Sequence, residues 1–120
     1  MTSRRTIGLI LLLAMLIMPG VNIAAGKQGP LYGPYAIAGL DNNQYWFRLV
    51  GGTTVYVSAV GLPNSDLDLY IYDGNGRLAA KDVDATSICV LAIDVIRSGE
   101  FLIEVRNVGF RANEYILEVR

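Results

Sequence analysis

The chain has 120 residues, 52% of them hydrophobic and 18% charged, with a formal net charge of −1, and this length suits a single domain. It contains no histidine and one cysteine, which excludes Ser–His and Cys–His nucleophilic pairs, most zinc sites and a disulfide within the chain. Charges of both signs alternate without a basic cluster, so the positive surface that nucleic-acid binding needs is also excluded.

The N-terminal segment, residues 1–26, has the three parts of a secretory signal peptide. Arg4-Arg5 precedes an uncharged apolar block, Ile7–Met18, and small residues follow at Ala24–Gly26, where cleavage after Gly26 fits. The alternative is an uncleaved membrane anchor, although spanning a bilayer takes about 20 apolar residues and a Pro-Gly pair ends this block earlier. We expect a signal helix, a secreted or extracytoplasmic protein (periplasm, cell surface or extracellular), and no membrane contact once the signal is removed.

Residues 27–34 are expected to form a leader, within a Gly- and Pro-rich stretch that runs to Gly39, and residues 35–120 to form the folded domain. Beyond this stretch, apolar and polar residues alternate with the period of two that is typical of strands. The first four strands are expected at Gln44–Val50, Thr53–Val60, Leu67–Asp73 and Arg77–Lys81. A hairpin turn over Asp73–Gly76 joins the last two, because Gly and Asn accept the positive φ that such turns require.

Three more strands are expected at Ser87–Asp94, Phe101–Val105 and Tyr115–Val119. The first is a nearly continuous apolar run, so we expect it to be buried on both sides, with Cys89 in the core. The outer residues of the other two pair acids with arginines and are expected to face water. Six or seven strands, with turn signals about every 8–12 residues, predict an all-β, antiparallel β-sandwich.

Four blocks carry a resemblance to a known family: Tyr45-x-Phe47, Asp66–Asp73, Ser98-Gly99-x-Phe101-x-Ile103-x-Val105 and Tyr115-x-Leu117-x-Val119. In this order, over residues 34–120, they resemble the bacterial pre-peptidase C-terminal domain family. The resemblance implies a jelly-roll-like β-sandwich that is not catalytic and usually lies at the C-terminus of secreted proteases. Some members bind collagen or other polymers, and others assist secretion or stability. No enzyme is attached here, so we expect a free-standing module.

Calcium binding in that family would involve two acidic elements, one ahead of the first strands and an Asp-x-Asp before the Tyr-x-Phe strand. Here the second element reads Asp41-Asn42-Asn43, and residues 26–34 contain no acid. Asp41 and Asn43 could supply two oxygens, whereas calcium takes six to eight, with several carboxylates among them. We therefore expect no cofactor.

Two acids, Asp66 and Asp68, stand two residues apart and so point the same way on a strand. A pair of carboxylates can hydrolyse glycosides across a cleft, but a small sandwich offers little cleft to raise the pKa of one acid. The interpretation we favour is that they cap the strand and bind loop amides. The chain is therefore predicted not to be an enzyme.

Three aromatic residues form the candidate binding site: Trp46, Tyr70 and Tyr72, called here the aromatic patch. Tyr70 and Tyr72 share a strand face with Asp68, and Trp46 lies on the polar face of its own strand. Such a patch suits a fibrous protein or a glycan if it is exposed, and otherwise the rings are simply packed. The sequence thus predicts a secreted, non-catalytic binding module that docks an extracellular or envelope protein or polysaccharide. The alternative is a structural or secretion-assisting partner of a separately encoded exported hydrolase.

Overall fold

The computed structural model describes residues 30–120, so the predicted signal segment 1–26 and most of the predicted leader lie outside the described residues. The described part is built of strands joined by turns and short loops: β1 (Leu31–Ile37), β2 (Asn42–Leu49), β3 (Thr53–Gly61), β4 (Leu67–Tyr72), β5 (Leu78–Asp82), β6 (Ile88–Val95), β7 (Gly99–Asn107) and β8 (Asn113–Val119). Within residues 30–120 no helix has the length and apolar character needed to cross a membrane.

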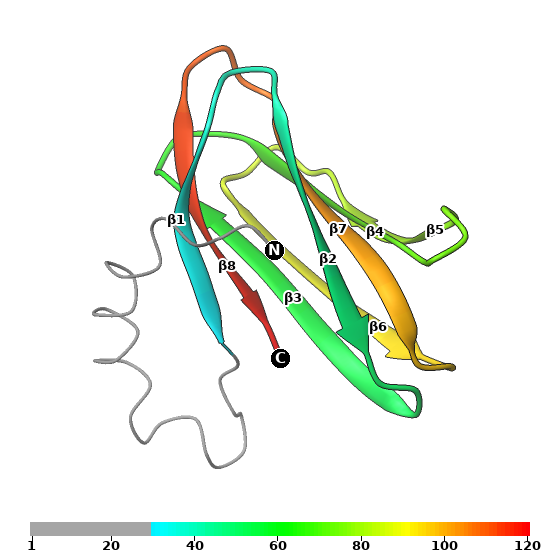
Figure 1. Ribbon diagram of the computed structural model, residues 1–120. Coiled ribbons are helices and arrows are strands. Elements are labelled where there is room, and N and C mark those ends of the chain that lie inside the picture. Colours follow the sequence, from blue (N-terminus) through cyan, green and yellow to red (C-terminus); the bar gives the residue numbers. More distant parts are fainter. Residues whose placement is uncertain (1–29) are drawn as a thin grey trace, which may run out of the picture.

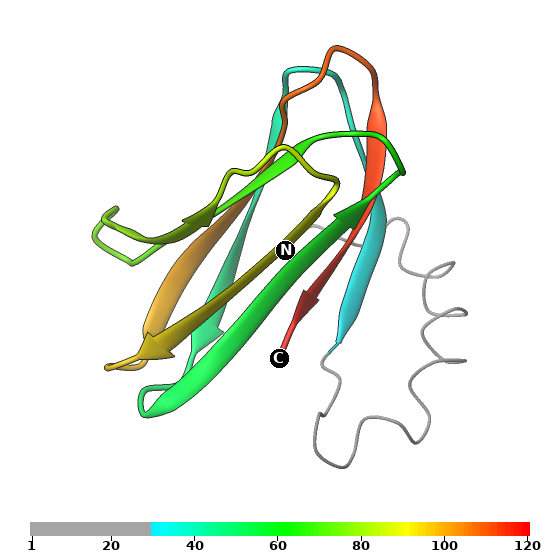
Figure 2. The same ribbon diagram turned by 180° about the vertical axis from the view of Figure 1, so that it is seen from behind.

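The strands form two antiparallel sheets that face each other. The first sheet has the order β1-β8-β3-β6 and the second the order β2-β7-β4-β5. The chain doubles back at the β4–β5 hairpin, so that strands pair successively as β4·β5, β3·β6, β2·β7 and β1·β8. β2 and β7 cross in front of β3 and β6 in Figure 1 and behind them in Figure 2. The fold is thus an eight-stranded jelly-roll β-sandwich, which confirms the predicted fold class.

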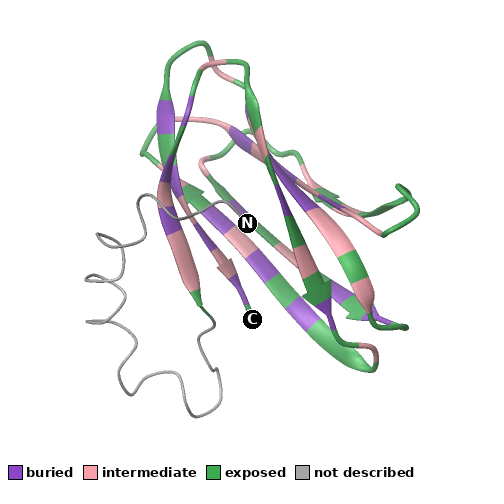
Figure 3. Cartoon of the chain, in the orientation of Figure 1, coloured by how far each residue is buried: buried purple, intermediate pink, exposed green. Residues whose placement is uncertain are grey.

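The core lies between the sheets and follows from the period-two alternation. Along β4 the side chains of Leu67, Leu69 and Ile71 are fully buried, while the residues between them are only partly covered. Figure 3 shows the same alternation of buried and exposed residues along β3. Each fully buried aliphatic side chain contributes about 1.5–3 kcal/mol. Cys89 is also fully buried, as predicted.

A polar contact crosses this core and ties the two sheets together. The hydroxyls of Tyr45 in β2 and Tyr115 in β8 lie 2.6 Å apart, and the Asn43 amide Nδ2 donates to the Tyr115 hydroxyl at 2.9 Å. Burial, with Tyr45 beside it, raises the pKa of Tyr115. Because buried hydroxyls need partners, this contact favours one relative alignment of the two sheets.

Strand β1 is a correction to the expected loose leader, since residues 31–37 form a strand that pairs with β8. Gly33 and Pro34 interrupt the alternation and lie where the register shifts, between Tyr32 and Tyr35. β1 is an edge strand, where a bulge and a missing N–H are tolerated. The sequence pattern is therefore broken although the strand forms.

Strand β6 corrects a second expectation, because it is buried on one side only. On its inner face Cys89, Ile93 and Val95 are buried and Leu91 is partly buried, but Ile88 and Val90 on the outer face are 53% and 55% exposed. β6 is the edge of the first sheet, and an apolar run does not say whether its outer face is covered. Its edge is partly protected, because the Val90 N–H donates to Asp82 Oδ2 at 2.9 Å.

The acids and arginines of the last two strands only partly follow the prediction. Arg106 pairs with Glu104 within β7, and Arg120, the residue after β8, pairs with Glu118 of that strand. β7 and β8 belong to different sheets. Glu104, expected to face water, is 5% exposed, because it lies on a central strand between Gln44 and Tyr70 and its carboxylate is paired with Arg106.

Candidate functional site

The outer face of the second sheet carries the aromatic patch, and the strand register arranges its side chains in rows. Leu102 of β7 lies directly opposite Trp46 of β2 on one side and Tyr72 of β4 on the other. Two residues along, Glu104 lies between Gln44 and Tyr70. Residues opposite each other in antiparallel strands project from the same face. An apolar row thus runs beside a hydrogen-bonding row.

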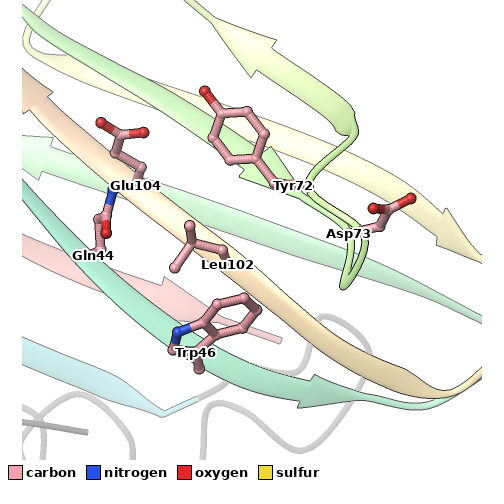
Figure 4. Close-up of a pocket in the computed structure, with 7 residues that line it drawn as sticks. Gln44, Trp46, Tyr72, Asp73, Leu102 and Glu104 are labelled. Carbon is pink, nitrogen blue, oxygen red and sulfur yellow. The ribbon is translucent and has the colours of Figure 1, made fainter.

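A shallow groove of about 240 Å³ lies over the apolar row. Figure 4 shows Trp46 and Tyr72 on either side of Leu102, with Gln44 and Glu104 next along the strands. Trp46 is 53% exposed, and Tyr72 is partly buried. The lining comes from three strands and the β4–β5 hairpin: Gln44, Trp46, Tyr72, Asp73, Gly76, Leu102 and Glu104.

Tyr70 supports this groove from one side and is not among the residues that line it. The Arg106 guanidinium carbon lies 4.1 Å from the centre of its ring. The Tyr72 ring is almost parallel to it, with ring centres 6.2 Å apart. Arg106 and Tyr72 lie in opposite directions along the strand from Tyr70, so the Tyr70 ring is held between them. This stack orients Tyr72 toward the groove.

Glu104 supplies a carboxylate at the floor of the groove, and Arg106 neutralises it. Arg106 Nε donates to Glu104 Oε2 at 2.8 Å, and a second nitrogen lies 3.5 Å from Oε1. This hydrogen bond raises the pKa of Arg106, so the guanidinium stays charged. A carboxylate has about four acceptor positions, so Glu104 retains capacity to accept from a ligand.

Asp73 lines the groove as part of the hairpin turn. Its Oδ1 accepts from the N–H groups of Asn75 and Arg77 at 2.8 and 2.9 Å. The hydrogen bond from Arg77, with that from Asn75, lowers the pKa of Asp73. Gly76 has a φ of +84°, a conformation that glycine adopts without strain. The predicted turn is confirmed, and it also shapes the site.

The acid pair considered for catalysis lies beyond this groove. Asp68 stands opposite Arg106 in the next row, and burial followed by the nearby Asp66 raises the pKa of Asp68. Asp66 precedes β4, and its Oδ1 is buried without a hydrogen-bond partner, so that oxygen does not bind a loop amide as we expected.

The two residues considered for calcium have other contacts. Asp41 Oδ1 accepts from the Asn42 N–H at 2.8 Å in the β1–β2 turn. Asn43 Nδ2 donates to the Tyr115 hydroxyl and, at 3.3 Å, to the Ala36 carbonyl. Within residues 30–120 the structure brings together no group of three or more His, Cys, Asp or Glu side chains that could hold a metal. That the protein needs no calcium stays a prediction.

Sequence reasoning missed several groove residues, namely Gln44, Leu102, Glu104, Asp73 and Gly76. Alternation placed Glu104 on an outer face, and this was the available signal. Alternation does not show that β7 lies between β2 and β4, and this strand order places Leu102 between Trp46 and Tyr72.

No family model matches the chain, and no curated protein matches it. Among solved structures, it is similar to the pre-peptidase C-terminal domain of a collagenase from Bacillus anthracis, with a TM-score of 0.66, 12% identity, and coverage of 78% of this chain and 90% of that one. The resemblance drawn from the four sequence blocks is therefore confirmed at the level of the fold.

Two further solved structures are similar. The periplasmic inhibitor of g-type lysozyme from Aeromonas hydrophila has a TM-score of 0.50 and 15% identity, and the match covers 83% of this chain and 93% of that one. A carbohydrate-binding module of lichenase 5A from Cellvibrio mixtus, in complex with cellotriose, has a TM-score of 0.48 and 12% identity, with coverage of 77% of each chain.

Proposed function

We propose that this protein is an exported, non-catalytic binding module that docks an extracellular or envelope macromolecule on the outer face of its second sheet. The observation that carries the proposal is the groove between Trp46 and Tyr72, two aromatic side chains from different strands on one open face. Aromatic rings that are rigid and partly exposed supply much of the binding energy at recognition surfaces.

Export rests on the signal pattern of residues 1–26. The non-catalytic character rests on the lack of histidine in the sequence and on the state of the groove carboxylates. Glu104 is held in an ion pair with Arg106, and hydrogen bonds from the hairpin lower the pKa of Asp73, so Asp73 is not poised to donate a proton near neutral pH.

The test is a pull-down of the full chain on insoluble extracellular polymers, protein and polysaccharide, with a double variant, Trp46→Ala with Tyr72→Ala. We expect the double variant to lose binding while its far-ultraviolet circular dichroism is unchanged. Tyr56→Ala is the matched control, because Tyr56 is an aromatic residue of β3, 41% exposed, on the opposite sheet. Equal retention of all three proteins would contradict the proposal. Capture only by a co-expressed exported hydrolase would favour the accessory role instead.

A further inference from the structure

We propose that the groove binds a neutral polysaccharide that runs across the strands of the second sheet, with sugar rings stacked on Trp46 and Tyr72 and hydroxyls bound by Gln44 and Glu104. This inference rests on the proposed function and names its ligand class. It follows from the pairing of two rows, from the size of the groove and from its charge.

The apolar row fits the faces of sugar rings. Trp46 and Tyr72 are separated by one intervening strand, so their backbones lie roughly 10 Å apart at a strand spacing of about 4.8 Å. Leu102 fills the floor between them. A pyranose ring presents a flat face of C–H groups, which packs on an aromatic ring and on an aliphatic side chain. The row therefore offers successive apolar platforms to a chain of rings crossing the sheet.

The hydrogen-bonding row fits the edges of the same rings. Gln44 and Glu104 lie two residues farther along their strands than the apolar row, which is about 7 Å. The Gln44 amide both donates and accepts, and the Glu104 carboxylate accepts. A sugar hydroxyl also donates and accepts, so these two side chains match a polyhydroxylated edge. A purely apolar ligand would remove water from the partly buried Glu104–Arg106 pair without replacing its hydrogen bonds, and this desolvation costs free energy.

The charges around the groove favour a neutral ligand. Glu104 is paired with Arg106 at 2.8 Å within β7, and Arg48 of β2 lies 4.0 Å from Glu100 of β7. Asp73 is held by the hairpin N–H groups, whose hydrogen bonds, with the charge of Arg77, lower its pKa. The other charged residues of this face are Asp68, which lies opposite Arg106, and Lys81, which lies opposite Tyr70. Opposite charges are thus matched locally, and neither an anionic nor a cationic polymer gains a field of one sign.

The groove is also small for a ligand that it would enclose. Its volume of about 240 Å³ lies below the roughly 300–1,000 Å³ of pockets that surround a drug-sized molecule. A stable protein partner would bury about 800 Å² on this side, far more than a strip bounded by two rings. A narrow, open groove suits a chain that passes through it and extends beyond both ends.

The experiment is affinity electrophoresis of the full chain in native gels that contain one soluble polymer each. The neutral probes are hydroxyethyl cellulose, a mixed-linkage glucan, xylan and galactomannan; carboxymethyl cellulose is the anionic counterpart of the first, and gelatin is the protein probe. We expect at least one neutral polysaccharide to retard the protein. Trp46→Ala and Tyr72→Ala should each lower the affinity obtained from this retardation at least tenfold, and Glu104→Gln should lower it about tenfold.

Two controls separate the stacking role from a general loss of structure. Tyr72→Phe keeps the ring and should bind nearly as well as the parent, whereas Tyr72→Ala should not. Tyr56→Ala on the opposite sheet should leave binding unchanged. Retardation by gelatin alone, lost in the Trp46 variant, would overturn the polysaccharide inference and leave the proposed function standing. Stronger retardation by carboxymethyl cellulose than by its neutral counterpart, or no retardation by any neutral probe, would also overturn it. Polymer binding that survives both alanine variants would overturn the two proposals together.

Discussion

Two arginines on the same sheet face test how burial sets the contribution of an ion pair to the free energy of unfolding. Arg106 pairs with Glu104, whose side chain is 6% exposed, whereas Arg48 pairs with Glu100, whose side chain is 54% exposed. Arg106→Ala leaves a buried carboxylate without its cation. The full loss of a buried pair costs about 3–5 kcal/mol, but the Arg106 side chain is 43% exposed, so water replaces part of the interaction. We expect a loss of about 2 kcal/mol in the free energy of unfolding.

Arg48→Ala is the matched control, and it should change the free energy of unfolding by less than about 0.5 kcal/mol. Thermal and urea unfolding measure both, and the Arg106 variant should melt roughly 10 °C lower. Arg106 also covers the Tyr70 ring, so a double-mutant cycle with Glu104→Gln separates the two contributions. The coupling between Arg106 and Glu104 should be about 1 kcal/mol or more. Equal losses of unfolding free energy for the two arginine variants, or no coupling in the cycle, would refute the reasoning that burial of the carboxylate sets the contribution of the ion pair to stability.

Three further predictions concern stability. Burial raises the pKa of the Cys89 thiol from 9.0 to about 12, so the stability that the neutral thiol contributes is complete below about pH 9 and is lost as the pH rises toward 12. Cys89→Ala should therefore reduce the loss of stability between these pH values in alkaline unfolding. Iodoacetamide should label the thiol of the parent only when the protein unfolds. Leu40 has a φ of +61° and is exposed, so Leu40→Gly should raise the free energy of urea unfolding by about 0.5–1 kcal/mol, and a decrease would argue against strain there. Tyr115→Phe removes the hydroxyl that contacts Tyr45 and accepts from Asn43 and should cost about 1–3 kcal/mol in the same assay, whereas an unchanged midpoint would mean that the contact contributes nothing.

The candidate site was predictable in part. Aromatic residues on otherwise polar strand faces indicated Trp46, Tyr70 and Tyr72, and all three lie on the outer face of one sheet. Tyr70 nevertheless lies between Arg106 and Tyr72, and the groove is completed by residues such as Leu102 and Glu104 that carry no distinctive signal of their own.

Local sequence determined the strands that have a regular alternation and a definite turn. The β4–β5 hairpin illustrates this, because Asp73–Gly76 forms its turn and Leu67, Leu69 and Ile71 alternate toward the core. Both signals act between residues a few positions apart, so they can be seen in the chain itself. They also sufficed to indicate an antiparallel sandwich and a buried Cys89.

Tertiary structure alone decided which strands are neighbours and which lie at an edge. β1 forms despite Gly33-Pro34 because β8 offers a partner to an edge strand. β6 exposes Ile88 because no other part of residues 30–120 covers the outer face of its sheet at that position. The groove exists because β7 inserts between β2 and β4 and so brings Trp46 and Tyr72 to either side of Leu102. Cross-strand neighbours are set by the order of strands in a sheet, which depends on how the whole chain packs, and no local period in the sequence encodes that order.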